Sequence, residues 1–353
     1  MPISNTSRAL VATATIALLA GCSGGSATSP ISSVGSQSIN HAQHAQSLTH
    51  AQILAKTLLV KPGVSALLSH GPIVVSPDAD FSGVVFLSDA GTNEVYRITA
   101  KGKATSVGSG WSEPQGIGVD SKGNVYVADT ANSRVVELSK TGKPVAILSD
   151  PGQYPAGVAI AADGTVGVTN IISTSGGEGS VSFYTAGSTS PECTSSGTLS
   201  EDYFIGVDSS DNFYFDGFDA STGAITLATA KPCGSVSATG ASANIEFPGG
   251  VNVYESGRGK KAVQTLGWGD QSGLAVYQFS LPSYSPEATV SLGGGSDEVQ
   301  YAIAKSKKFV ASGDAGNADL EIWAWPAGGS SPSATVTGFS EPIGVGFTPS
   351  GDE

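Results

Sequence analysis

The sequence has little charge, almost no methionine and few aromatic residues. Only 13% of its 353 residues are Asp, Glu, Lys or Arg, one is methionine and 7% are aromatic. Low charge combined with 47 glycines favours short strands joined by tight turns over a helical protein. A hydrophobic content of 39% excludes wholesale disorder, and the length suffices for one large domain or two ordinary ones.

Histidine and positive charge are also scarce. No histidine follows His70, so the rest of the chain has no imidazole for a general base, a zinc site or a Ser-His-Asp arrangement. The 17 Lys and Arg residues are outnumbered by 30 Asp and Glu, and the net charge of −13 argues against a nucleic-acid partner. His41 and His44 lie in a Gln- and Ser-rich stretch and are interpreted as solvated linker.

Residues 1–22 are typical of an export signal. Arg8 precedes an apolar run from Ala9 to Ala20, which is too short to span about 30 Å of hydrocarbon but suits a signal peptide. The run ends in Leu19-Ala20-Gly21-Cys22, which resembles a bacterial lipobox. The resemblance implies cleavage before Cys22 and its acylation, so that membrane lipid is one partner. The alternative is an ordinary secretory signal in which the cysteine falls there by chance.

The lipobox also leads to an expected location and domain order. We expect a lipid-anchored protein of the bacterial cell envelope, and Ser23 in place of Asp implies sorting to the outer membrane where the organism has one. Residues 23–70 are predicted to be a flexible tether rich in Ser, Gln and His. Residues 71–353 are predicted to be the folded domain.

A repeated segment organises residues 71–353. Its clearest copy spans residues 113–129, and related segments begin near residues 155, 202, 248, 298 and 342, at intervals of 41 to 50 residues. Further alternating strands follow in each unit, and the fourth is often introduced by Ser-Pro. Four short strands per unit, with Gly, Asn and Asp at the turns, predict the blade of a β-propeller.

The number of blades follows from the two ends of the repeat. Residues 84–107 supply only three strands of a unit, whereas residues 342–347 supply a single innermost strand. Joining the two closes a ring and removes both exposed sheet edges. The sequence therefore predicts an all-β, six-bladed propeller of four-stranded antiparallel blades. An alternative remains, in which residues 73–75 form the innermost strand of the first blade.

The clearest copy resembles a known repeat. The pattern Pro-x-Gly-Ile-x-Val-Asp, followed by Gly-Asn-Val-Tyr-Val-Ala-Asp-Thr-x-Asn-x-Arg-Val, covers residues 114–135 and closely resembles the NHL repeat. The resemblance implies a six-bladed propeller. Propellers of this kind include scaffolds, sugar- and peptide-binding modules, gluconolactonase-type lactonases and several lyases, so the fold does not select a function. The lyases depend on propeller histidines, and their absence here disfavours that chemistry.

Acidic residues recur at two positions of the repeat. One set follows the second strand of each unit and is interpreted mainly as capping its own turn: Asp89, Asp129, Asn170, Asp216, Asp270 and Asp314. The other set lies on the links that lead to the innermost strands: Glu113, Glu201, Asp202, Asp297, Glu298 and Glu341. In NHL-like blades both positions lie on one face. We therefore expect carboxylates around one mouth of the channel, suited to Ca²⁺ or a cationic ligand unless they are merely structural or solvated.

These observations support a binding function over an enzymatic one. The first hypothesis is a non-catalytic module that binds a ligand, a glycan or a protein, with no required cofactor and with Ca²⁺ as the candidate ion. The alternative is a metal-dependent lactonase-type hydrolase. The resemblance would then give Glu113 or Glu341 the role of the metal-holding glutamate, but the full ligand set has no match in sequence. No catalytic residue is assigned.

Two further expectations concern packing. After acylation of Cys22, only Cys193 and Cys233 remain as thiols, and they take nearly equivalent places in successive blades of a protein expected in an oxidising compartment. A disulfide between them is predicted, against the alternative of two separate buried thiols. Trp323 and Trp325 alternate on one strand and are expected to pack between blades, with an exposed sugar-stacking platform as the alternative.

Overall fold

The structure is a computed structural model that describes residues 72–75, 83–100, 103–256 and 263–348. The described residues all belong to one compact unit. The predicted signal peptide, Cys22 and the tether at residues 23–70 lie outside the described residues. Within the part that is described, no helix has the length and apolar character needed to cross a membrane.

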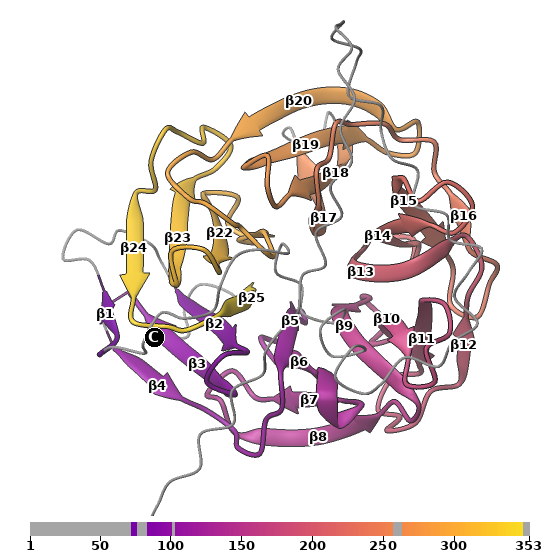
Figure 1. The fold of residues 1–353 in the computed structure, drawn as a ribbon, viewed down its shortest axis with the longest axis horizontal. Coiled ribbons are helices and arrows are strands. Elements are labelled where there is room, and N and C mark those ends of the chain that lie inside the picture. The colour runs from indigo at the N-terminus through magenta and orange to yellow at the C-terminus, as the bar shows by residue number, and fades with distance from the viewer. Residues whose placement is uncertain (1–71, 76–82, 101–102, 257–262, 349–353) are drawn as a thin grey trace, which may run out of the picture. The chain divides into compact units, whose positions relative to one another are not determined.

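Six antiparallel sheets form six blades around a central axis (Figure 1). From the axis outward, blade 1 contains β25 (Pro342–Phe347), β2 (Val84–Asp89), β3 (Glu94–Thr99) and β4 (Ala104–Ser106). Blade 2 contains β5 (Pro114–Val119), β6 (Val125–Asp129), β7 (Arg134–Leu138) and β8 (Pro144–Ser149). Blade 3 contains β9 (Gln153–Ile160), β10 (Val166–Ser173), β11 (Ser180–Tyr184) and β12 (Cys193–Ser195). A short 3-10 helix, η2 (Thr130–Asn132), joins β6 to β7.

The remaining three blades follow in chain order. Blade 4 contains β13 (Leu199–Val207), β14 (Phe213–Asp219), β15 (Ile225–Ala230) and β16 (Ser237–Ala238). Blade 5 contains β17 (Pro248–Ser256), β18 (Val263–Asp270), β19 (Ala275–Ser280) and β20 (Ser285–Ser291). Blade 6 contains β21 (Ala302–Ile303), β22 (Phe309–Asp314), β23 (Asp319–Ala324), β24 (Ala334–Thr337) and, as a fifth strand, β1 (Val74–Val75). The predicted all-β fold of six blades is confirmed.

The first blade combines the two ends of the propeller. β25 pairs with β2 in antiparallel register, from Val85 opposite Phe347 to Asp89 opposite Pro342. β1 lies at the outer edge of blade 6, where Val74 is opposite Thr337. Residues 342–347 therefore form the innermost strand of blade 1, and residues 74–75 extend the neighbouring blade instead.

Glycines allow the inner strands to approach one another near the axis. A Cβ added at Gly116 would overlap the carbonyl oxygen of Ala156 in the next blade, and one at Gly344 would overlap the carbonyl oxygen of Gln115. Because six strands converge on one axis, a side chain at these positions has no room. This crowding explains why the repeat carries glycine inside a strand, where glycine otherwise weakens a sheet.

The core lies between the blades. The second strands are buried on both faces; in β2 every residue from Val84 to Asp89 is buried. Trp323 and Trp325 are buried in the cluster between blades 5 and 6 that also contains Val276 and Val290, so the expected packing between blades is confirmed. On the rim, a disulfide joins Cys193, the first residue of β12, to Cys233 in the turn before β16, with their Cα atoms 5.7 Å apart.

Candidate functional site

The two ends of the central channel differ in chemistry. Every inner strand begins at the same end of the channel, where Glu113 precedes β5 and Glu341 precedes β25. The other end is lined by residues of all six inner strands, which in five of the six include the last residue of the strand. We call the first the acidic end and the second the apolar end.

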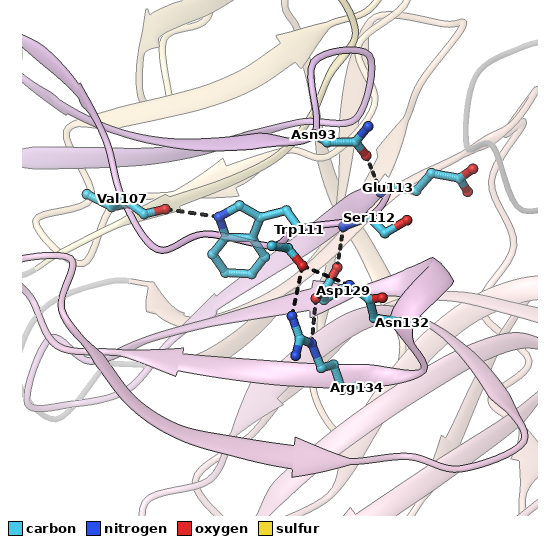
Figure 2. A network of polar contacts seen from close by, with 9 residues as sticks. Asn93, Val107, Trp111, Ser112, Glu113, Asp129, Asn132 and Arg134 are labelled. Atoms are coloured by element: carbon cyan, nitrogen blue, oxygen red, sulfur yellow. Dashed lines mark hydrogen bonds and ion pairs between the residues drawn. The ribbon is translucent and has the colours of Figure 1, made fainter.

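At the acidic end, Asp129, the last residue of β6, forms hydrogen bonds with the segment that leads into β5. Asp129 accepts hydrogen bonds from the backbone N–H of Ser112 at 2.7 Å and from Nδ2 of Asn132 at 2.9 Å, and it forms an ion pair with Arg134 at 2.6 Å (Figure 2). The Arg134 guanidinium also donates to the carbonyl of Gly110. Asp129 is fully buried, and these donors replace the water that its charge would otherwise need.

The same arrangement recurs in other blades. Asp89 accepts from the backbone N–H groups of Ser340 and Glu341, at 2.9 and 2.8 Å. Asp314 likewise accepts from those of Ser296 and Asp297, and Asp270 accepts from those of Glu246 and Phe247. This set of residues therefore ties the second strand to the incoming link, a role beyond capping its own turn.

Two of the residues expected at the turn after the second strand lie within the strand instead. Asn170 and Asp216 are inside β10 and β14, whose pairing continues for three residues beyond them, and neither is at the turn. Asp216 accepts from the backbone N–H of Phe204 and from the indole N–H of Trp268. Burial raises the pKa of Asp216 to about 7. The placement of both residues at a turn was wrong because these strands are longer than those of blades 1 and 2.

Three of the predicted link carboxylates gather at the acidic end. Glu341 is 7% exposed, and its pKa is raised to about 7 by burial and by the negative charges of Asp89, Glu113 and Asp297. Asp297 accepts a hydrogen bond from the side-chain amide of Gln271 at 2.8 Å. In Figure 2 the Glu113 carboxylate points away from the Asp129–Arg134 pair.

The other three predicted link residues are engaged inside their own blades. Glu201 accepts a hydrogen bond from the hydroxyl of Tyr203 at 2.6 Å. Asp202 is buried, and its pKa is raised by that burial and by the charges of Asp216 and Glu178. Glu298 lies with Asp314 and Glu321 in blade 6. The six link carboxylates are therefore divided among separate surroundings and do not form one site.

Sequence reasoning missed a carboxylate in blade 3. Asp150 lies on the link between β8 and β9 and accepts a hydrogen bond from the Ser182 hydroxyl at 2.8 Å. Burial raises its pKa to about 6. In blade 3 the second strand, β10, has Asn170 in place of an aspartate. The carboxylate of this blade comes instead from Asp150, on the segment before β9. The signal in the sequence is the acid in Ser149-Asp150-Pro151, which lies five residues before Pro155, whereas Glu113 directly precedes the equivalent Pro114.

The apolar end contains a pocket of about 370 Å³. Every inner strand contributes apolar side chains to its lining, among them Val119, Ile160, Val207, Val253, Ile303 and Phe347. The side-chain oxygen of Gln300 accepts hydrogen bonds from the backbone N–H groups of Ile117 and Val345, at 3.0 and 3.1 Å, and so joins blade 6 to blades 1 and 2. Sequence reasoning missed this pocket, although five of the six inner strands end in an apolar residue that lines it.

Lys305 lies at the rim of the same pocket. Its ammonium donates to the backbone carbonyl of Asp120, 3.1 Å away, across the start of blade 2. Partial burial lowers the pKa of Lys305. Among the described residues that line the pocket, Lys305 alone is cationic.

The chain has recognisable similarity to known proteins in one repeat and in its fold. Residues 112–138 match the NHL repeat family. No curated protein matches the sequence. A chain in the crystal structure of a nidogen/laminin complex is similar with a TM-score of 0.54 and 13% identity, over 75% of this chain and 98% of that one. A protein of unknown function from Bacteroides caccae is similar with a TM-score of 0.53 and 11% identity, over the same shares. At these identities the likeness shows the fold alone. The chain thus carries an NHL repeat within a six-bladed propeller.

Proposed function

We propose that the chain is a non-catalytic binding module of the bacterial cell envelope that holds a small amphipathic molecule in the apolar end of its channel. The NHL repeat and the propeller fold support a binding or scaffold role. The single observation that carries the proposal is the pocket of about 370 Å³ on the axis, lined by all six blades. A volume of this order is typical of sites for small molecules.

The lining indicates an apolar body for the ligand. The inner strands contribute mainly aliphatic side chains, and Val119, Ile160, Val207, Val253 and Ile303 are only partly buried. Polar groups lie among them, including Asp208, Asn252 and Gln300. Burying the apolar surface against an apolar molecule is favourable by about 25 cal/mol per Å². The walls belong to the inner strands of six packed blades, so the pocket is formed before the ligand arrives. Binding therefore costs little conformational entropy of the protein.

The rim indicates an anionic or acceptor group at one end of the ligand. Lys305 already donates to a backbone carbonyl, and an ammonium has three donors in all, so two remain for a ligand. Hydrogen bonds from a charged donor are stronger than neutral ones. We therefore expect a molecule with an apolar body and a single anionic group.

The fluorescent probe 1-anilinonaphthalene-8-sulfonate has this chemistry and tests the proposal. We expect one probe molecule to bind the full chain. Val253→Trp, which fills the pocket, should abolish binding, and Lys305→Met should weaken it about tenfold because one charge-assisted hydrogen bond is lost. Lys307→Met is the matched control, since Lys307 is exposed nearby but does not line the pocket. Fluorescence titration gives the three affinities.

Two outcomes would count against this function. Equal probe affinity in Val253→Trp and in the wild type would show that the probe binds elsewhere. Turnover of a lactone by the wild-type chain, lost in Glu341→Gln, would favour the lactonase-type hydrolase instead, because a carboxyl group with a pKa of about 7 suits a general base.

The envelope location rests on the sequence at Cys22. We expect the protein expressed in bacteria to partition into the detergent phase on Triton X-114 separation, because several acyl chains give stable anchoring. Cys22→Ala should move it to the aqueous phase. If both proteins remain aqueous, the cysteine is not acylated and the anchor is wrong.

A further inference from the structure

Blades 2 and 6 place different partners beside the carboxylate that ends their second strand. In blade 2, Asp129 is paired in register with Arg134, the first residue of the third strand. The Arg134 guanidinium lies 2.6 Å from the Asp129 carboxylate and neutralises it. In blade 6 the register is the same, with Asp314 opposite Asp319. An acid therefore takes the place of the arginine.

The third strand of blade 6 brings a second acid to the same face. Side chains alternate along a strand, so Asp319, Glu321 and Trp323 share one face of β23. This face is buried, since Trp323 packs against blade 5 and Glu321 is only 3% exposed. Opposite Glu321 stands Ser312, two residues before Asp314. The strand thus presents two carboxylates where blade 2 presents Arg134 and Val136.

A third carboxylate completes a compact cluster. Glu298 pairs with Asp314 in an isolated bridge, and both are fully buried. One carboxylate oxygen from each of Glu298, Asp314 and Glu321 lies within 4.8 Å of the others. Since Ca²⁺ binds oxygen at about 2.3–2.6 Å, two ligands of one ion lie at most about 5 Å apart. The three oxygens meet this condition.

Asp314 accepts hydrogen bonds from Ser296, Asp297, Gly316 and Asn317, but other buried groups at the cluster have no donor. Neither carboxylate oxygen of Glu298 has a hydrogen-bond partner, although the residue is 0% exposed. The hydroxyl of Tyr301 is 1% exposed and has no hydrogen-bond partner either. Burial raises the Tyr301 pKa, and the nearby charge of Glu298 raises it further. In the described parts of the chain, no Lys or Arg forms an ion pair with these acids. Buried polar groups in native proteins are nearly always satisfied, so this site requires an explanation.

We infer that a divalent cation, Ca²⁺, binds between β22 and β23 of blade 6, with Glu298, Asp314 and Glu321 as ligands, in the place that the Arg134 guanidinium takes in blade 2. Its structural effect would fall on the weakest inner strand, because β21 has only two residues and Glu298 leads into it. The cation would hold the segment before β21 against β22, as Asp129 and Arg134 hold the segment before β5 against β6. The inference is independent of the apolar pocket.

The experiment measures the melting temperature and the bound metal of the full chain. After treatment with a chelator and buffer exchange, saturating CaCl₂ should raise the melting temperature by about 5 °C, and elemental analysis should find one Ca²⁺ per chain. Glu298→Gln and Glu321→Gln should each lose this response. Glu94→Gln is the matched control, because Glu94 stands opposite Asp89 in the same register position as Asp319 and should keep it.

A further variant keeps the test decisive where a glutamine disturbs folding. Asp319→Arg would restore the pairing of blade 2, so it should melt higher than the wild type in chelator and should no longer respond to CaCl₂. A wild type without bound metal or CaCl₂ response, together with a higher melting temperature of Glu298→Gln in chelator, would overturn the inference and show that Glu298 and Glu321 share a proton instead. A CaCl₂ response retained in both glutamine variants would also overturn it, because the ion would then lie elsewhere.

Discussion

Replacement of Cys193 and Cys233 by serine together is expected to lower the free energy of unfolding by about 4 kcal/mol. The disulfide closes a loop with a sequence separation of 40 residues, and the chain-entropy model assigns a stabilisation of this size to such a loop. Cys193 is half-buried and Cys233 is exposed, so serine leaves no large cavity. The effect should therefore come mainly from the greater freedom of the unfolded chain.

Denaturant titration of the double variant and the wild type measures this difference. Cys22→Ala is the control, since it removes the third cysteine without touching the disulfide and should leave the unfolding midpoint unchanged. Wild-type protein that is reduced before unfolding should behave as the double variant does. Equal midpoints for the oxidised wild type and the double variant would show that blades 3 and 4 are held in register without the bond.

Truncation after Ser340 is expected to abolish cooperative folding. It removes β25, whose Ile343 and Val345 are fully buried, and it leaves β2 as an unpaired inner edge. It also removes the N–H of Gly344 that donates to the Ser88 hydroxyl, and the N–H of Val345 that donates to Gln300. Since an opened ring exposes the cores of two blades, we expect aggregation instead of a stable monomer.

Truncation after Thr348 is the matched control, because it retains all of β25. Size-exclusion chromatography and thermal melting monitored by circular dichroism compare the two proteins. A monomer that melts cooperatively within about 5 °C of the control would contradict the importance of β25. Residues 73–75 would then be the candidate for the strand that pairs with β2 in place of β25.

The fold could be predicted because its causes are local and repeated. Each unit carries strand-length apolar segments bounded by Gly, Asn or Asp, and the inner strands repeat the glycine that Gly116 represents. The unequal ends of the repeat then pointed to the pairing of residues 342–347 with 84–89. Strand lengths were less predictable, because the extra residues of β10 and β14 depend on pairing across the blade and not on a local signal.

The candidate sites could be predicted only in part, because side-chain direction decides which groups meet. The acids on links and second strands could be identified from the repeat, but Glu298 turns into blade 6 beside Asp314 while Glu341 stays at the channel. The acids of β23 were visible in the sequence as alternation with Trp323. Because Glu321 and Trp323 share a face of β23, burial of Trp323 implies burial of Glu321.

The positions of β1 and β25 have a mechanical consequence for an anchored protein. With the anchor proposed at Cys22, tension from the membrane would reach β1 first, and β1 is paired with β24 through two residue pairs at the outer edge of blade 6. Ring closure relies on different contacts, those between β25 and β2. A pull from the membrane would therefore detach β1 from β24 and lengthen the segment between the anchor and the propeller. The six blades would stay closed, and the channel would stay intact.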